Sequence, residues 1–363
     1  MLKIKIIQRT IIYILLILSL VLGGMTNHLR FAEMLGFITG ILLFLYTWNF
    51  TKGEILLPKG FKLFVVFLVL LFLNVLWSGH KASTREYFVN FVTSGLLWIS
   101  VFNLRQFFLP RIDKLIVVAG VFFSVFFFIS YFSGINVIDN GWSFFSYNPA
   151  SNHMHLGDLW VIIAILCVYW LKQKFRWRIL PLLGISIFLL AISLSRSAYL
   201  ALGVGLFYLY FQKVKPGWIV KLSILIIPVL FIFASFSKSI FSARPYFIQG
   251  LQGIINRPFG VGMGNFFEIS RRYFETKLTT IAHNLILEVF VGMGIFGLVF
   301  VGWLTSIVVD IIRSKGKSGL VYAGIFFAIL ANFMFDTTYT IPTMLWIWFM
   351  SLGLAQPSKE IKT

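Results

Sequence analysis

The sequence has 363 residues, of which 59% are hydrophobic and only 12% are charged, and its formal net charge is +19. Apolar runs of about 20 residues, enough to cross the hydrocarbon core of a bilayer, recur along the whole chain and exclude a large soluble domain. The single cysteine, Cys167, lies in one of these runs, which excludes an internal disulfide and a cysteine-rich metal site.

The excess of basic residues, 31 Lys and Arg against 12 Asp and Glu, is typical of nucleic-acid-binding proteins and also of cytoplasmic membrane loops. We interpret it as topological and expect no nucleic-acid partner. Most of the basic residues become cytoplasmic when both termini are placed in the cytoplasm. The N-terminal segment resembles a signal peptide, but no small-residue cleavage site follows, so we expect an uncleaved first helix.

The fold class predicted from this pattern is an all-α polytopic membrane protein, with residues 1–363 forming a single membrane domain. Two of the outer segments, 134–154 and 237–283, are long enough to carry a site. We expect the second to be a long, helical outer loop that carries part of the site. About twelve transmembrane helices are expected, at 10–26, 31–50, 61–77, 86–103, 114–133, 155–171, 179–195, 197–212, 218–236, 284–312, 319–335 and 340–356.

The stretch "SLSRSAYLA" (193–201) places Arg196 in a segment that is otherwise uncharged from 179 to 212. As one helix this segment would be about 51 Å long, which exceeds a hydrocarbon core of roughly 30 Å. We therefore expect two crossings with Arg196 at the outer turn between them. There it either snorkels to lipid phosphates or serves a functional site.

The motif "NHMHLGD" (152–158) contains His153, His155 and Asp158. Two histidines and a carboxylate can bind a metal ion, but this spacing is unspecific. Hydrogen bonding at the membrane interface, or contact with a glycan, is the favoured interpretation, and we expect no metal site.

The motif "RPFGVGMGNF" (257–266) is rich in glycine, but no strand precedes it as a dinucleotide-binding loop requires. We expect a tight turn in which glycines adopt positive φ. Further on, "TTIAHNLILEVFVGMGIFG" (279–297) places His283 and Asn284 at the mouth of a span. His283 is either structural or able to take a proton from a hydroxyl, and Asn284 orients it or caps the helix.

Three further charged residues are candidates at the outer face. Asp336, in "FMFDTTYT", is expected to pair with an outer arginine or to cap a helix end. Arg271 and Arg272 are candidates for binding an acceptor or a second phosphate, and a solvated helix face is the alternative. Arginine forks suit phosphate oxygens, so recognition of an anionic lipid head is the chemistry that fits these residues.

Four segments in this order resemble the O-antigen ligase and O-antigen polymerase superfamily, whose members transfer glycans from an undecaprenyl-pyrophosphate carrier. They are "SLSRSAYLAL" (193–202), "SAR" (242–244), "RPFGVGMGNF" (257–266) and "AHNLILEVFVGMGIFG" (282–297). The motif-bearing resemblance covers about residues 190–300.

The resemblance implies a fold like that of the C-class glycosyltransferases, and inverting glycan transfer without metal or cofactor. It implies that Arg196 and Arg244 bind the donor pyrophosphate and that His283 assists the acceptor hydroxyl. Arg272 is a further candidate for binding the donor pyrophosphate, and the resemblance does not imply this role. Asp336 matches an acidic position late in the family's sequences. The location implied is the outer face of the bacterial inner membrane.

Several functions remain open from the sequence. A ligase moves a finished glycan to an acceptor such as lipid A–core, whereas a polymerase extends the glycan on its carrier. We favour the ligase; transfer to a protein or another cell-wall polymer is a smaller possibility. A transporter of lipid-linked glycans would place charges mid-membrane and often show a repeat, and neither is visible here. A structural membrane protein without activity is the remaining alternative.

Overall fold

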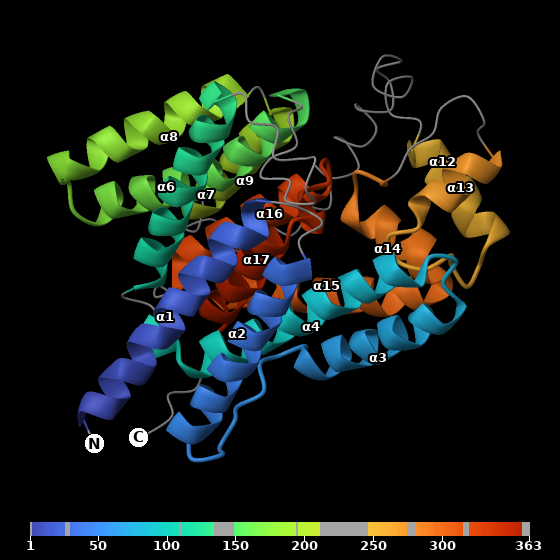
Figure 1. Cartoon of the computed structure of the whole chain (residues 1–363), viewed down its shortest axis with the longest axis horizontal. Coiled ribbons are helices and arrows are strands. Elements are labelled where there is room, and N and C mark those ends of the chain that lie inside the picture. The colour runs from blue at the N-terminus through green and yellow to red at the C-terminus, as the bar shows by residue number, and fades with distance from the viewer. Residues whose placement is uncertain are drawn as a thin grey trace.

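The computed structural model describes residues 2–25, 30–108, 111–133, 149–193, 195–210, 246–273, 281–314 and 319–357. Within these ranges the chain is helical and contains no strand, which confirms the all-α prediction for this part of the protein (Figure 1). The first eight longer helices are α1 (Leu2–Met25), α2 (Arg30–Phe50), α3 (Phe61–Trp77), α4 (Lys81–Asn103), α6 (Ile112–Ser133), α7 (Pro149–Gln173), α8 (Leu180–Ser193) and α9 (Arg196–Tyr210), with the short α5 (Arg105–Phe108) between α4 and α6.

The later helices are α12 (Tyr246–Asn256), α13 (Phe266–Tyr273), α14 (Leu285–Met293), α15 (Gly297–Arg313), α16 (Leu320–Phe333) and α17 (Pro342–Ala355). Every expected span falls on these helices except 218–236, which lies outside the described residues. By length and composition, the segments Phe31–Phe50 and Leu285–Arg313 are able to cross a membrane. The other apolar helices in the described part have 10–17 residues, which is shorter than these two segments. The number of twelve transmembrane helices therefore stays a prediction.

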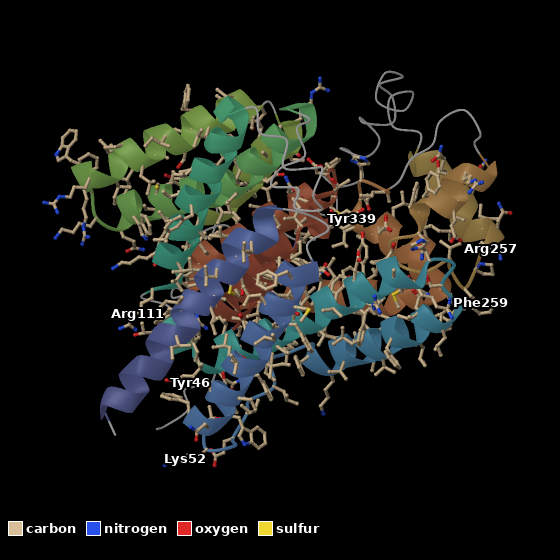
Figure 2. All side chains as sticks on the ribbon, viewed as in Figure 1. Tyr46, Lys52, Arg111, Arg257, Phe259 and Tyr339 are labelled. Atoms are coloured by element: carbon tan, nitrogen blue, oxygen red, sulfur yellow. The ribbon has the colours of Figure 1, made fainter. Side chains whose placement is uncertain are left out.

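The described helices run back and forth between two ends of the molecule. Trp77, at the end of α3, donates through Nε1 to the carbonyl oxygen of Phe259, next to α12. Asn103, at the end of α4, instead contacts the backbone of Leu56, ahead of α3. We name the end with α12 and α13 the cap end, and the end with Lys52 and Arg111 the basic end; Figure 2 shows Arg257 and Phe259 far from Lys52 and Arg111.

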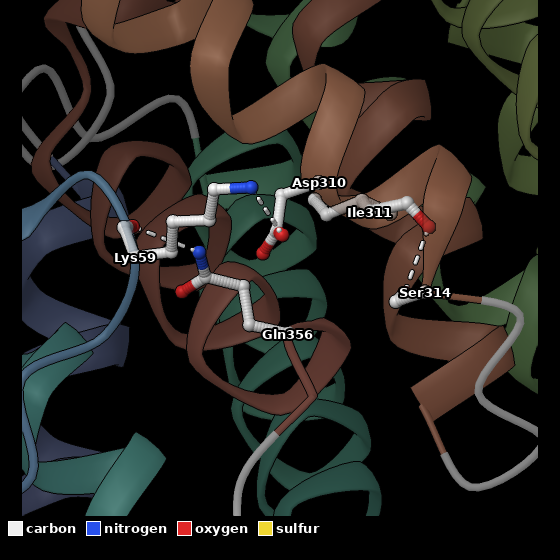
Figure 3. Close-up of polar contacts among 5 residues, drawn as sticks. All are labelled: Lys59, Asp310, Ile311, Ser314 and Gln356. Carbon is white, nitrogen blue, oxygen red and sulfur yellow. Dashed lines mark hydrogen bonds and ion pairs between the residues drawn. The ribbon is translucent and has the colours of Figure 1, made fainter.

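Polar contacts close the basic end (Figure 3). Lys59, ahead of α3, forms an ion pair with Asp310 of α15 at 3.0 Å. Gln356, just after α17, donates through Nε2 to the Lys59 carbonyl oxygen. Its Oε1 accepts from the indole of Trp98. The Lys59 side chain is largely exposed, so the ion pair contributes little, about 0–1 kcal/mol. The amide contacts of buried Gln356 fix where α17 ends.

The core is centred on α17, in which every residue is buried. A helix that is apolar on all sides has no solvent face, and α17 packs against α1, α4 and α16. The Phe349 ring stacks on Trp303 of α15, with centroids 5.5 Å apart, and also contacts Phe64 of α3. These aromatic contacts join α3 and α15, which are distant in the sequence, to the central helix α17.

The glycine-rich segment forms the expected tight turn, with φ values of 76° at Gly260, 100° at Gly262 and 76° at Gly264. Its backbone pairs with the end of α14, because the Gly262 amide donates to the Gly292 carbonyl oxygen at 2.8 Å. Asn74 of α3 bridges the two segments by donating to that carbonyl and accepting from the Met263 amide. The turn is therefore a packing element and not a dinucleotide loop.

The expected span 284–312 coincides with the candidate span Leu285–Arg313, and the structure adds a break inside it that the sequence did not predict. It is divided into α14, a 3₁₀ helix over Gly294–Phe296, and α15. The Ile295 amide donates to the Pro258 carbonyl oxygen at 2.8 Å, and Gly294 has φ of 59°. The Pro258 carbonyl oxygen, in the glycine-rich turn, thus replaces a helical acceptor for the Ile295 amide, and the chain bends at Gly294.

We predict that Gly260→Ala destabilises the protein, whereas the control Gly184→Ala does not. A Cβ on Gly260 would lie 2.2 Å from the Gly292 carbonyl oxygen and would sit on a left-handed backbone. The loss should be about 2 kcal/mol or more. Gly184, inside α8, has no heavy atom within 4 Å of an added Cβ. Thermal unfolding of the two purified variants measures the difference, and equal midpoints would contradict the role of the turn.

Candidate functional site

The helix break at Arg196 is built by the serines of "SLSRS". Ser193 Oγ donates to the Leu190 carbonyl oxygen and accepts from the Ser195 amide as α8 ends. Ser195 Oγ then accepts from the Ala198 amide at 3.2 Å, as an N-cap residue does. Helix α9 consequently begins at Arg196, whose side chain is exposed. The predicted break is confirmed, and Arg196 stands at the positive end of a helix dipole.

The first turn of α9 is tied to the segment that follows α16. Ser197 Oγ donates to Asp336 Oδ2 at 2.8 Å and lies 2.9 Å from Ser195 Oγ. Asp336 Oδ1 accepts from the Thr337 amide at 2.6 Å. Among the described residues the one ion pair is Lys59–Asp310, and the described side-chain partner of Asp336 in this contact is Ser197. Arg244 and the Arg272 side chain lie outside the described part, so the expected pairing of Asp336 with an outer arginine stays a prediction.

A second polar layer lies beneath this contact. Asp158 of α7 accepts at Oδ1 from Asn332 of α16 at 2.6 Å, and Asn332 Oδ1 accepts from the hydroxyl of Thr338. Asp158 and Asn332 are both buried. Buried polar side chains need partners, and these contacts connect α7, α16 and the 3₁₀ helix Thr338–Thr340. These hydrogen bonds fix the position of the segment around Asp336 against α7 and α16.

His283 and Asn284 lie at the start of α14. Asn284 Oδ1 accepts from the Leu287 amide at 2.9 Å and caps the helix, while its Nδ2 donates to the Met334 carbonyl oxygen at 2.8 Å. The capping alternative for Asn284 is therefore confirmed, and the same side chain ties the His283 segment to the chain two residues before Asp336. His283 is half-buried with φ of 51°, a conformation that a non-glycine residue rarely adopts.

Glu288 connects these segments and was not among the predicted site residues. Its buried carboxylate accepts from the Gly264 amide at 3.1 Å, the Ala282 amide at 3.0 Å and the Tyr339 hydroxyl at 3.4 Å. It thus joins the glycine-rich turn, the residue before His283, and the segment after Asp336. Burial, followed by the Glu288 charge, raises the pKa of Tyr339 well above its usual value, so the phenol keeps its proton. Figure 2 labels Tyr339 in this region.

A sequence signal for Glu288 exists. It is the only Asp, Glu, Lys or Arg between Lys277 and Asp310, just as Arg196 is alone in its apolar stretch. A lone carboxylate among apolar residues must find partners inside the fold. The sequence alone does not say which ones.

The structure brings four of the predicted residues to the cap end of the helices: Arg196, His283, Asn284 and Asp336. Arg271 is exposed on α13, and Arg272 follows it there, but its side chain lies outside the described part. His153 belongs to the first turns of α7, again without a described side chain, and Arg244 lies outside the described residues. Among the described residues, no group of three or more His, Cys, Asp or Glu side chains is placed to hold a metal ion.

These features define a helical protein in which four of the predicted site residues lie at or next to helix termini at one end of the fold. Residues 181–302 match a protein-family model described as O-antigen ligase. The match confirms, for this segment, the resemblance to the O-antigen ligase and polymerase superfamily. This is a membrane-associated family of glycosyltransferase-type enzymes. None of the curated proteins matches the chain.

We predict that Glu288→Ala lowers the stability of the protein, because two backbone amides and a phenol would lose a buried acceptor. An unsatisfied buried donor costs about 1–3 kcal/mol. The unfolding midpoint of Glu288→Gln should lie between those of Glu288→Ala and the parent, because glutamine keeps one acceptor oxygen. Thermal unfolding in detergent measures the effect.

The matched control is Glu54→Ala, at an exposed carboxylate in the loop before α3. It should leave the unfolding midpoint within error of the parent. A Glu288→Ala variant as stable as Glu54→Ala would show that the carboxylate does not hold the three segments together.

Proposed function

We propose that the protein is an O-antigen ligase-like glycan transferase of the bacterial inner membrane. It moves a glycan from undecaprenyl pyrophosphate to an acceptor hydroxyl, on lipid A–core or a similar glycan, at the outer face. The observation that carries the proposal is that the family match spans both Arg196 and His283, residues which lie far apart in the sequence and at the same end of the fold.

The membrane topology is also part of the proposal. Residues 1–363 form a single membrane domain of about twelve spans, with both termini and the basic end in the cytoplasm and the cap end outside. Its fold is like that of the C-class glycosyltransferases. Support comes from the exposed cluster Lys172, Lys174, Arg176 and Arg178, which runs from the last turn of α7 into the link to α8, because such clusters favour the cytoplasmic side. The loop 237–283 carries part of the site, including Arg244 and the helices α12 and α13.

Arg196 and Arg244 bind the donor pyrophosphate in this proposal, and Arg272 is a further phosphate ligand. Arginine offers a planar fork of donors that matches two phosphate oxygens and stays charged at every relevant pH. The amide groups at the N-terminus of α9 add positive potential beside Arg196. The Ser197–Asp336 hydrogen bond fixes that helix end, and exposure of the Arg196 side chain leaves its guanidinium free to meet a lipid head.

The transfer itself is inverting and needs no metal or cofactor. The acceptor hydroxyl oxygen bonds to the anomeric carbon of the donor as the bond from that carbon to the pyrophosphate oxygen breaks. The hydroxyl proton passes to His283, and the electron pair leaves with undecaprenyl pyrophosphate, whose charge the arginines stabilise. Asn284 and Glu288 position the histidine through the backbone on either side of it.

We predict that the purified protein in liposomes transfers a labelled short glycan from undecaprenyl pyrophosphate to lipid A–core, as a single product that needs the acceptor. No ion gradient should be required, because bond formation is driven by the donor. A ladder of longer carrier-linked glycans without lipid A–core would identify a polymerase instead. Movement of the donor across the bilayer without any new bond would identify a transporter and contradict the proposal.

We predict that Arg196→Ala abolishes transfer while Arg196→Lys keeps part of it, since lysine retains the charge and loses the bidentate fork. The matched control is Arg178→Ala, at an exposed arginine of the basic end. It should transfer at the parent rate. The rate of product formation at equal amounts of folded protein is the measurement. Full activity of Arg196→Ala would refute the assignment of Arg196 to the donor.

A further inference from the structure

Helix α12 has three distinct faces. Gln249, Gly250 and Gly253 are buried, and the two glycines lie against Leu287 of α14 and Ile269 of α13. Leu251 and Ile255, four residues apart and therefore on one stripe, are 57% and 78% exposed. The exposed residues that follow each of them, Gln252 and Asn256, form a separate polar stripe. The outward half of the helix is thus divided into an apolar and a polar side.

The apolar stripe continues beyond the helix. Phe259, four residues after Ile255, is 62% exposed. Its ring lies 6.2 Å from the ring of Phe296, which lies at the same distance from the indole of Trp77. On either side of Phe296 in the sequence, Ile295 of the 3₁₀ helix and Leu298 at the start of α15 are also exposed. The stripe therefore meets the cap-end termini of α3 and α15, as Figure 2 shows for Phe259.

That meeting point is where the exposed apolar face of α3 ends. Helix α3 packs against α4 and α15, and its outward residues Val65, Val69, Phe72 and Leu76 are exposed and apolar. In a membrane-spanning helix such a stripe faces the lipid. Trp77 ends it with a half-exposed indole, the side chain that prefers the boundary between lipid and water. The stripe on α12 extends this lipid-facing surface without a break at Phe259.

The charge pattern agrees with a headgroup level at the same place. Arg257, between Ile255 and Phe259, is exposed and can extend its guanidinium to lipid phosphate. The described exposed residues of α13 are Phe267, Glu268 and Arg271, so that helix carries more charge on its outward face than α12 does. The exposed residues of α12 thus show the division into an apolar and a polar side that an interfacial helix has.

We propose that the edge of the cap formed by Leu251, Ile255 and Phe259 is inserted in the outer leaflet of the bilayer, so that α12 is an interfacial helix and its partner is the lipid surface. Gln252 and Asn256 then face water. The proposal rests on the membrane-spanning part of the proposed function and is independent of the transfer reaction. It places the glycine-rich turn at the depth of the lipid headgroups.

Spin labelling of the full chain in liposomes tests this placement. Cys167 is the only cysteine, so Cys167→Ala provides a background for single-cysteine variants. Nitroxides are attached at Leu251→Cys, Ile255→Cys and Phe259→Cys, with Gln252→Cys and Asn256→Cys as matched controls on the same helix. Val69→Cys on α3 is the lipid-facing reference. The measurement is the accessibility of each nitroxide to oxygen, which concentrates in lipid, and to a water-soluble nickel complex.

The three edge positions should resemble Val69→Cys, with an oxygen-to-nickel accessibility ratio several-fold above that of the two controls. Equal nickel accessibility on both sides of α12 would show that the edge faces water and would overturn the proposal. Protection of the edge from both reagents would show that protein covers it, with the same consequence. A water-accessible Val69→Cys would overturn the membrane-spanning topology itself, whereas failure of glycan transfer alone leaves these results unaffected.

Discussion

A buried carboxylate must satisfy its oxygens within the protein, and the way Glu288 does so organises the whole cap end. Its acceptors take hydrogen bonds from the glycine-rich turn, from the residue before His283, and from Tyr339 beyond α16. These segments are distant in the sequence and share no regular secondary structure. Because each donor would be left unpaired without the carboxylate, Glu288 links the positions of the three segments to one another.

The segment 181–302 that matches the family model does not contain all of the frame around the candidate site. Asp336 and Tyr339 come from the chain after α16, and Asn74 comes from α3, far ahead of the match. Arg196 and His283 are thus held in place partly by residues outside the matched segment. A protein sharing only the matched motifs would need equivalent supports from other helices to present the same arrangement.

Local chemistry explains which features were predictable from sequence. The serines around Arg196 form caps within a few residues, and the glycines of 257–266 adopt the positive φ that their lack of a side chain allows. The break at Gly294 and the partners of Asp336 were not predictable. Both depend on contacts with remote segments, Pro258 in one case and Ser197 in the other. An apolar run of suitable length predicts a span, but it does not reveal where a distant carbonyl takes over one of its hydrogen bonds.

The left-handed backbone of His283 has a consequence for how this protein can evolve. Glycine would adopt φ of 51° with less strain, so a histidine there lowers stability by about 1–3 kcal/mol unless its surroundings compensate. Mutations that increase thermal resistance by relaxing this residue would remove the imidazole from the mouth of α14. Under the role proposed for His283, stability and activity are in conflict at this position, and a more heat-resistant relative would have to gain its stability elsewhere, most readily in the helices of the basic end.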